Sequence, residues 1–158
     1  MADQETSQLE ERLRTDIKDA QRQRDQVRLD TLRGALNAFH LEIVARTDEK
    51  HASFHVPLSE QDRIAIVEKL VKQREEAAQF YRSGGRSESA LQEEREASLL
   101  KEYLPAQLTD DELRDVVSDI IAREGKDFRK VMPAAARETK GRADGRRVQL
   151  IVRELTGS

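Results

Sequence analysis

The sequence predicts an all-α protein with an N-terminal helical domain of about four helices at 1–104 and a small three-helix C-terminal domain at 105–158. Apolar residues recur every three or four positions along most of the chain, which is the spacing of one helical face. Aromatic residues make up only 4% of the 158 residues and charged residues 37%, a poor composition for the strands of a β-sandwich. Pro105 divides the two domains because a helix cannot continue through it.

The first two helices are expected on the apolar repeats at 9–20 and 27–43. Gly34 interrupts the second repeat, and we expect it to allow a neighbouring helix to pack closely. Residues 47–58 lose the helical period and contain a proline, so we expect a loop there.

Ser59 begins the third helix as its N-cap, and Asp62 three residues later completes an approximate capping box. The glycines of "SGGR" at 83–86 are expected to end this helix. A fourth helix is expected from about Ser87 to Tyr103.

The C-terminal domain opens on "TDDEL", in which Thr109 and Glu112 form a capping box for the fifth helix. Gly125 is expected to stop that helix. A sixth helix is expected on 128–135, with Pro133 in its first turn, where a missing N–H is tolerated.

The segment "TKGRADGRRV" at 139–148 joins the sixth helix to a seventh on 148–155. We expect Gly141 to end the sixth helix in a left-handed conformation. Asp144 is expected to cap the seventh helix, with Gly145 as its first residue. These roles explain both glycines and the aspartate structurally, without any function.

The arginines and lysine of this segment are not explained by the helix junction. They gather around a helix N-terminus, which already carries partial positive charge and free N–H groups, so the segment is a candidate phosphate site. A solvated charged face is the alternative. The candidate residues are Lys140, Gly141, Arg142, Asp144, Gly145, Arg146 and Arg147, with Lys130 and Arg137 as an outer basic ring.

Charge is unevenly distributed along the chain. The whole protein has a net charge of −3, whereas the stretch from Arg123 to Arg153 holds ten Lys/Arg and four Asp/Glu. A local basic patch of this kind can attract nucleic acid even on an acidic protein.

Three segments in order, "VKQR" at 71–74, "LKEYLPAQL" at 100–108 and "KGRADGRRV" at 140–148, resemble the GatB/YqeY family. The resemblance implies a C-terminal domain similar to the tail of the B subunit of the tRNA-dependent Asp/Glu amidotransferase, which contacts tRNA. The corresponding family label is that of a carbon–nitrogen ligase with glutamine as amide donor. The chain departs from the family pattern at "AAA", 134–136, and in a longer 47–58 loop.

Independent catalysis is not expected, and we assign no catalytic residue, cofactor or metal ligand. The absence of cysteine excludes a thiol nucleophile and thiolate metal sites. The Gly/Ser-rich "RSGGRSES" at 82–89 is expected to be a loop between helices. His51 and His55 lie four residues apart, but a zinc site needs three or more ligands.

Two functions remain open. The first is a tRNA-binding accessory protein, linked by resemblance to tRNA-dependent amidation and to a tRNA-charging or amidotransferase enzyme. The alternative is a helical protein–protein adaptor that binds no nucleic acid. Phe128 is the aromatic residue nearest the basic segment and is expected in the core, which disfavours stacking on single-stranded bases. No secretory signal or membrane span is recognisable, so a cytoplasmic protein is expected.

Overall fold

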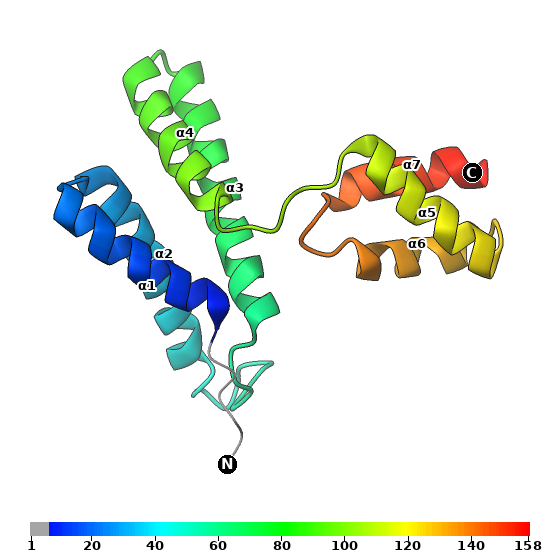
Figure 1. The fold of residues 1–158 in the computed structure, drawn as a ribbon, viewed down its shortest axis with the longest axis horizontal. Coiled ribbons are helices and arrows are strands. Elements are labelled where there is room, and N and C mark those ends of the chain that lie inside the picture. The colour runs from blue at the N-terminus through cyan, green and yellow to red at the C-terminus, as the bar shows by residue number, and fades with distance from the viewer. Residues whose placement is uncertain (1–6) are drawn as a thin grey trace. The chain divides into compact units, whose positions relative to one another are not determined.

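A computed structural model describes residues 7–158, and this part of the chain forms seven α-helices and no strand (Figure 1). The all-α prediction is therefore confirmed. The fold consists of two compact units, one that ends at Leu104 and one that begins at Pro105. None of the helices in the described part is long and apolar enough to cross a bilayer.

The first unit consists of two helical hairpins. The first hairpin is α1 (Gln8–Gln23) and α2 (Gln26–Ala45), and the second is α3 (Glu60–Ser83) and α4 (Ser87–Lys101). Helix α2 packs against both helices of the second hairpin, and α1 packs against α3. The buried side chains at the centre of this unit include Leu13, Leu32, Phe39, Val67 and Leu100.

Local signals in the sequence set most ends of these helices. The Ser59 hydroxyl accepts the N–H of Asp62 and the Asp62 carboxylate accepts the N–H of Ser59, both at 3.0 Å, so the capping box is confirmed. Gly85 follows α3 with φ +74°. Helix α4 ends at Lys101, and the expected end at Tyr103 was two residues too late, because the chain turns before Pro105.

Gly34 does not provide a close helix contact. It lies on the exposed side of α2, and a Cβ built there would meet no atom within 4 Å. The buried side of α2 is formed by its neighbours Leu32 and Ala35 instead. The expectation of close packing was wrong because the glycine lies on the solvent side of the helical repeat.

The loop between α2 and α3 is organised by a buried arginine. The guanidinium of Arg46 donates to the carbonyl oxygens of Val56 and Pro57, both at 3.2 Å. It also pairs with Glu42 at 2.9 Å and Asp62 at 3.2 Å. The hydrogen bond to Glu42 raises the pKa of Arg46. One side chain thus joins the end of α2, the loop and the start of α3.

Tyr103 fastens the end of α4 to the first hairpin. Its ring is buried, its hydroxyl donates to the Asp16 carboxylate, and the Arg28 guanidinium donates to that hydroxyl at 3.4 Å. The Arg12 guanidinium lies 4.7 Å from the ring centre. Burial and the bond to Asp16 raise the pKa of the Tyr103 phenol, so the neutral form is the stable one.

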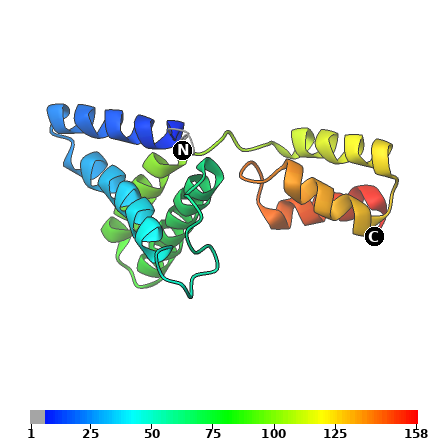
Figure 2. The same cartoon turned by 90° about the horizontal axis from the view of Figure 1, so that it is seen from below.

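The second unit is a bundle of α5 (Asp110–Glu124), α6 (Phe128–Glu138) and α7 (Gly145–Thr156), in which each helix packs against the other two (Figure 2). The Thr109–Glu112 capping box is confirmed, and Gly125 ends α5 with φ +87°. The buried residues of this core include Leu113, Val117, Ile120, Val131, Ala135, Val148 and Val152.

Pro133 lies deeper in α6 than the sequence indicated. Asp127 caps this helix and Phe128 is its first residue, so Pro133 is in the second turn and not in the first. Its ring is exposed. Water can therefore reach the carbonyl that loses its helical N–H partner, which lowers the cost of an internal proline.

Candidate nucleic-acid interface

The chain turns sharply between α6 and α7. Gly141 has φ +77°, so the predicted left-handed conformation is confirmed. The backbone N–H groups of Arg142 and Ala143 both donate to the carbonyl oxygen of Thr139, at 2.9 and 3.1 Å. Thr139 is itself buried, and its hydroxyl donates to the Ala135 carbonyl at 2.7 Å. The turn is therefore anchored on the core of its unit.

The N-terminus of α7 is capped by its own aspartate. The Asp144 carboxylate accepts the backbone N–H of Arg146 at 2.7 Å, and Gly145 is the first residue of the helix, as predicted. The sequence also suggested that free N–H groups at this end would bind phosphate. The Asp144 carboxylate occupies that position. An external anion is therefore expected to bind the basic side chains around the turn and not the N–H groups of the helix end.

The turn is also tied to the chain just before α5. The N–H of Leu108 donates to the Arg142 carbonyl oxygen at 2.7 Å, and the Gln107 side-chain amide donates to the Gly141 carbonyl oxygen at 3.3 Å. The segments "LKEYLPAQL" and "KGRADGRRV", far apart in the sequence, therefore meet in the fold.

Arg147 reinforces this contact. Its guanidinium donates to the Leu108 carbonyl oxygen and to the Asp110 carboxylate, both at 2.8 Å. The hydrogen bond from Arg147 lowers the pKa of the Asp110 carboxyl below its ordinary 3.8. Arg147 therefore has partners within the unit that link the starts of α7 and α5.

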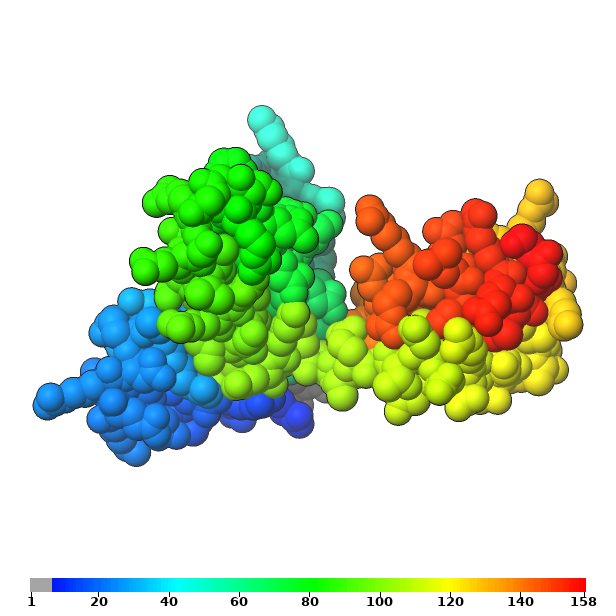
Figure 3. All heavy atoms as spheres, turned by 90° about the horizontal axis from the view of Figure 1, so that it is seen from above, coloured from blue at the N-terminus to red at the C-terminus, as the bar shows by residue number. Residues whose placement is uncertain are grey.

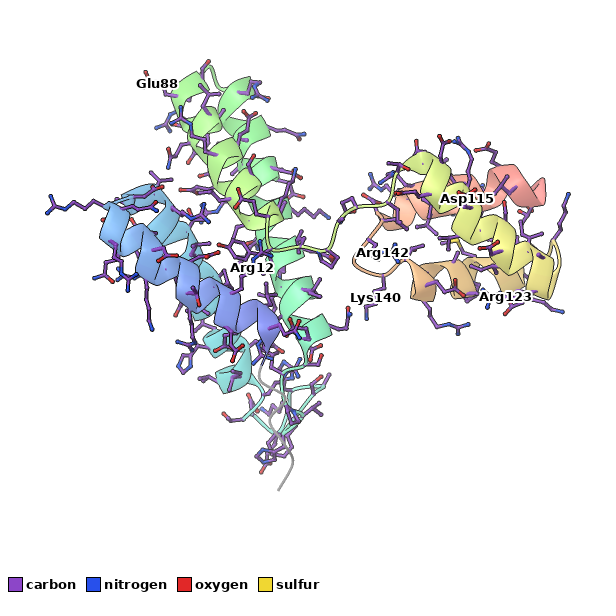
Figure 4. The ribbon with its side chains drawn as sticks, viewed as in Figure 1. Arg12, Glu88, Asp115, Arg123, Lys140 and Arg142 are labelled. Carbon is purple, nitrogen blue, oxygen red and sulfur yellow. The ribbon has the colours of Figure 1, made fainter. Side chains whose placement is uncertain are left out.

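Lys140, Arg142 and Arg146 differ from Arg147 in this respect. All three are exposed, and within the described residues none of their side chains has a hydrogen-bond or ion-pair partner. Lys140 and Arg142 lie on the turn between α6 and α7 (Figure 4). The backbone of this turn is fixed, while the charged groups of its side chains have no internal partner. This arrangement suits contact with an external anion.

Lys130 and Arg137 continue this pattern along α6. They are seven residues apart, so they lie on the same side of the helix, two turns from each other. Both are exposed and unpaired, and Pro133 and Ala136 lie between them on the outer side. We call Lys130, Arg137, Lys140, Arg142 and Arg146 the basic face.

Paired and unpaired cations are segregated within the second unit. Arg114 pairs with Asp111 and Glu154, and Arg123 pairs with Glu138, as Arg147 does with Asp110. Arg153 stacks on the Phe128 ring. The cations in residues 105–158 that have no such partner are Lys126, Arg129, Lys130, Arg137, Lys140, Arg142 and Arg146.

This segregation does not come from an excess of positive charge. Residues 105–158 hold eleven Lys/Arg and ten Asp/Glu. Six of the ten acids lie on α5, including Asp115 (Figure 4), whereas the outer side of α6 carries none. The sequence could not reveal which cations were free, because Asp110 lies 37 residues from Arg147, and Glu154, one of the two partners of Arg114, lies 40 residues from it.

The other candidate residues and segments named from the sequence have structural roles. His51 Nδ1 accepts the N–H of Ser53 at 3.0 Å, and the His55 ring lies against Phe54. Across residues 7–158, no three His, Asp or Glu side chains gather where they could hold a metal ion. Of the 82–89 segment, only residues 84–86 form the loop between α3 and α4. The rest belongs to the ends of those helices, so the expected loop was too long.

The first block of the resemblance, "VKQR", also has a packing role. Arg74 pairs with Glu93 at 3.2 Å and with Glu96 at 2.9 Å, which joins α3 to α4. Tyr103, in the second block, joins α4 to the first hairpin. In the third block, Lys140, Arg142 and Arg146 have no comparable internal role.

Comparison with known proteins agrees with the motif resemblance. A family model described as Yqey-like protein matches residues 10–156, which is nearly the whole chain. No curated protein matches the sequence.

Proposed function

This chain belongs to the Yqey-like protein family, and from that premise we propose that it is a non-catalytic accessory protein whose basic face binds the phosphates of tRNA. By resemblance, residues 105–158 form the domain similar to the tail of the amidotransferase B subunit, and 1–104 form a separate helical domain. In this proposal the protein serves tRNA-dependent amidation by holding tRNA or a tRNA-charging enzyme, and it carries no amide-transfer chemistry of its own.

The observation that carries the proposal is the segregation of unpaired cations. Leaving exposed Lys and Arg side chains unpaired in water costs little free energy. A scattered set of unpaired cations would therefore need no explanation. Here the free cations lie on α6, on the segments that adjoin its two ends and in the first turn of α7. The other cations of the unit pair with carboxylates or, for Arg153, stack on an aromatic ring. The field of such a face attracts a polyanion and orients it before contact.

The chemistry of the face favours structured RNA over single strands. It offers guanidinium and ammonium groups for phosphates but no aromatic ring on which a base could stack. Phosphate contacts of this kind fix position and register and carry little sequence information. Recognition of the folded shape of tRNA through its backbone is therefore the mode that these residues support.

A protein adaptor remains the second candidate, and an exposed apolar site in the first unit favours it. Leu41 and Val44 lie three residues apart on α2, with 59% and 50% of their surfaces exposed. Neighbouring exposed apolar side chains on one helical face are a usual feature of protein-binding surfaces. In that function the basic face would meet an acidic protein surface.

The test is fluorescence anisotropy of labelled total tRNA, titrated with the full chain at several salt concentrations. The variant Lys140→Ala/Arg142→Ala/Arg146→Ala removes three free cations and no internal hydrogen bond of a side chain. We expect weaker binding and a plot of log K against log salt that is shallower by about two to three.

A matched control removes the same charge from the first unit. Lys18, Arg33 and Lys69 are exposed and unpaired there. Their replacement by Ala should leave the salt slope unchanged. If the wild type does not bind tRNA, or if both triple variants lose affinity equally, the basic face has no specific role and the adaptor function is favoured.

A further inference from the structure

We call the segment 139–146, which carries Lys140, Arg142 and Arg146, the basic turn. A pocket that is open to solvent lies at the opposite end of α6 from it. It has a volume of about 460 Å³ and is lined by Lys126, Asp127, Phe128, Arg129, Arg153 and Ser158. We call it the Phe128 pocket. The sequence indicated that Phe128 lies in the core; its ring does pack against the core, but it is only partly buried and also forms a wall of this pocket.

The pocket gathers cations from two helices. Arg153, near the end of α7, holds its guanidinium 5.7 Å from the centre of the Phe128 ring. A guanidinium held on an aromatic ring keeps all its N–H donors available and loses less freedom when it binds an anion. Lys126 and Arg129 are exposed and have no side-chain partner in the described chain.

Asp127 is the acidic residue of the pocket, and its charge is partly engaged. Its carboxylate accepts the backbone N–H of Arg129 at 3.0 Å, as the N-cap of α6. Three cations therefore surround one capping carboxylate. The side chains that line the pocket carry a net positive charge, so phosphate is the chemistry that they favour.

The pocket and the basic turn are connected by the outer side of α6. Lys130 and Arg137 lie between them, and no carboxylate lies on that side of the helix. In the space-filling view, long side chains stand out from the second unit at both ends of α6, in yellow-orange and in orange (Figure 3). Helix α6 has 11 residues, so it is about 16 Å long, enough to run beside several successive phosphates of one nucleic-acid strand.

We propose that the Phe128 pocket binds a second backbone phosphate of the same RNA that the basic turn binds, so that the RNA lies along the outer side of α6. This inference rests on the proposed function. It adds Lys126, Arg129 and Arg153 to the contact and gives the RNA a direction on the protein. A phosphate of a free nucleotide has the same chemistry, and the experiment separates the two sources.

The experiment measures the salt dependence of tRNA anisotropy for the variant Lys126→Glu/Arg129→Glu, which leaves the Arg153–Phe128 contact in place. A salt slope shallower than wild type by about two supports the inference. Combining this variant with Lys140→Ala/Arg142→Ala/Arg146→Ala should reduce the slope further, because the two ends bind separate phosphates. Circular dichroism verifies that each variant retains its helices.

Each other result has a distinct meaning. If Lys126→Glu/Arg129→Glu keeps the wild-type slope while the basic-turn variant loses affinity, the inference is wrong and the proposed function stands. If the wild type does not bind tRNA, both fail. If ADP binds at the pocket in the wild type and not in the variant, while tRNA binding is equal in both, the pocket is a nucleotide site and the RNA path is overturned.

Discussion

The backbone N–H of Leu108 donates to the carbonyl oxygen of Arg142 at 2.7 Å, across 34 residues of sequence. This bond joins the chain entering α5 to the turn between α6 and α7. Because the backbone of Arg142 is held here, its side chain begins from a fixed point. Two arginines follow in the "GRRV" segment, and they have different roles. Arg147 bonds to the Leu108 carbonyl and so holds the start of α7 to the chain before α5, whereas Arg146 is exposed and has no partner in its unit.

Replacement of Arg147 by Gln should reduce stability more than it reduces RNA binding. The change removes the charged donor to the Leu108 carbonyl, a hydrogen bond worth about 1 kcal/mol, which for a unit of this size lowers Tm by roughly 4–8 °C. Thermal melts followed by circular dichroism measure the shift, and amide exchange at Leu108 localises it. Arg146→Gln is the matched control and should leave Tm unchanged while it weakens tRNA binding. The opposite pattern would reverse the two roles.

The ion pair between Arg147 and Asp110 predicts that the second unit loses stability at acid pH. Arg147 lowers the pKa of Asp110 in the folded state. A carboxyl with a lowered pKa stabilises the fold above its unfolded pKa, and this stability is lost as pH falls through the folded value. Melting temperatures should therefore fall below about pH 4, and Asp110→Asn should show a smaller fall. An equal fall in the variant would exclude Asp110 as the cause.

The two capping boxes should stabilise their own units. Thr109→Ala removes the hydroxyl that accepts the N–H of Glu112, and Ser59→Ala removes the equivalent acceptor for Asp62. Each loss should cost about 1 kcal/mol. Hydrogen exchange followed by mass spectrometry should show faster exchange in α5–α7 for the first variant and in α1–α4 for the second. Faster exchange in both units for either variant would mean that the units unfold together.

Arg46 should be one of the most sensitive positions in the first unit. Arg46→Ala leaves two carbonyls and two carboxylates without their shared donor, and we expect a loss of about 2 kcal/mol. Lys should restore little of it, because one ammonium cannot reach these oxygens together as a guanidinium does. Urea unfolding measures the change. Arg33→Ala, at an exposed and unpaired position of the same helix, should change stability by less than about 0.5 kcal/mol.

Tyr103 should make the first unit sensitive to alkali. Its pKa is raised above the ordinary 10.0 by burial and by the bond to Asp16. A group with a raised folded pKa stabilises the fold below its unfolded pKa, and this contribution is lost as pH rises above that value. Stability should therefore decline above about pH 10 in the wild type. Tyr103→Phe should be less stable at pH 7 and show a weaker decline, and an unchanged decline would assign the effect to other groups.

The parts of the fold that the sequence predicted are those encoded locally. A capping box is contained within four residues, so Ser59–Asp62 and Thr109–Glu112 could be recognised without knowledge of the rest of the molecule. Gly34 and Pro133 were misplaced because their positions are not encoded locally. The side of a helix that faces the core, and the residue at which it begins, depend on neighbours that lie outside the local pattern.

The candidate site was only partly predictable. The sequence identified the cations of the turn, but it could not distinguish Arg146 from Arg147, because the partners of Arg147 are brought close only by the fold. It also missed Arg129, in the first turn of α6, and Lys126, which lies just before the N-cap of that helix. A count of carboxylates along the helical repeat of α6 would have indicated that its outer side carries cations and no carboxylate.

Lysine footprinting with the wild-type chain tests the central claim most directly. Residues 105–158 contain three lysines, Lys126, Lys130 and Lys140, and all three lie along α6 or at its ends. Acetylation by a brief pulse of reagent, with and without tRNA, is read by mass spectrometry. The account predicts that tRNA protects these three lysines and leaves Lys18 and Lys69 in the first unit as reactive as before. Equal reactivity of Lys130 and Lys140 with and without bound tRNA would contradict it.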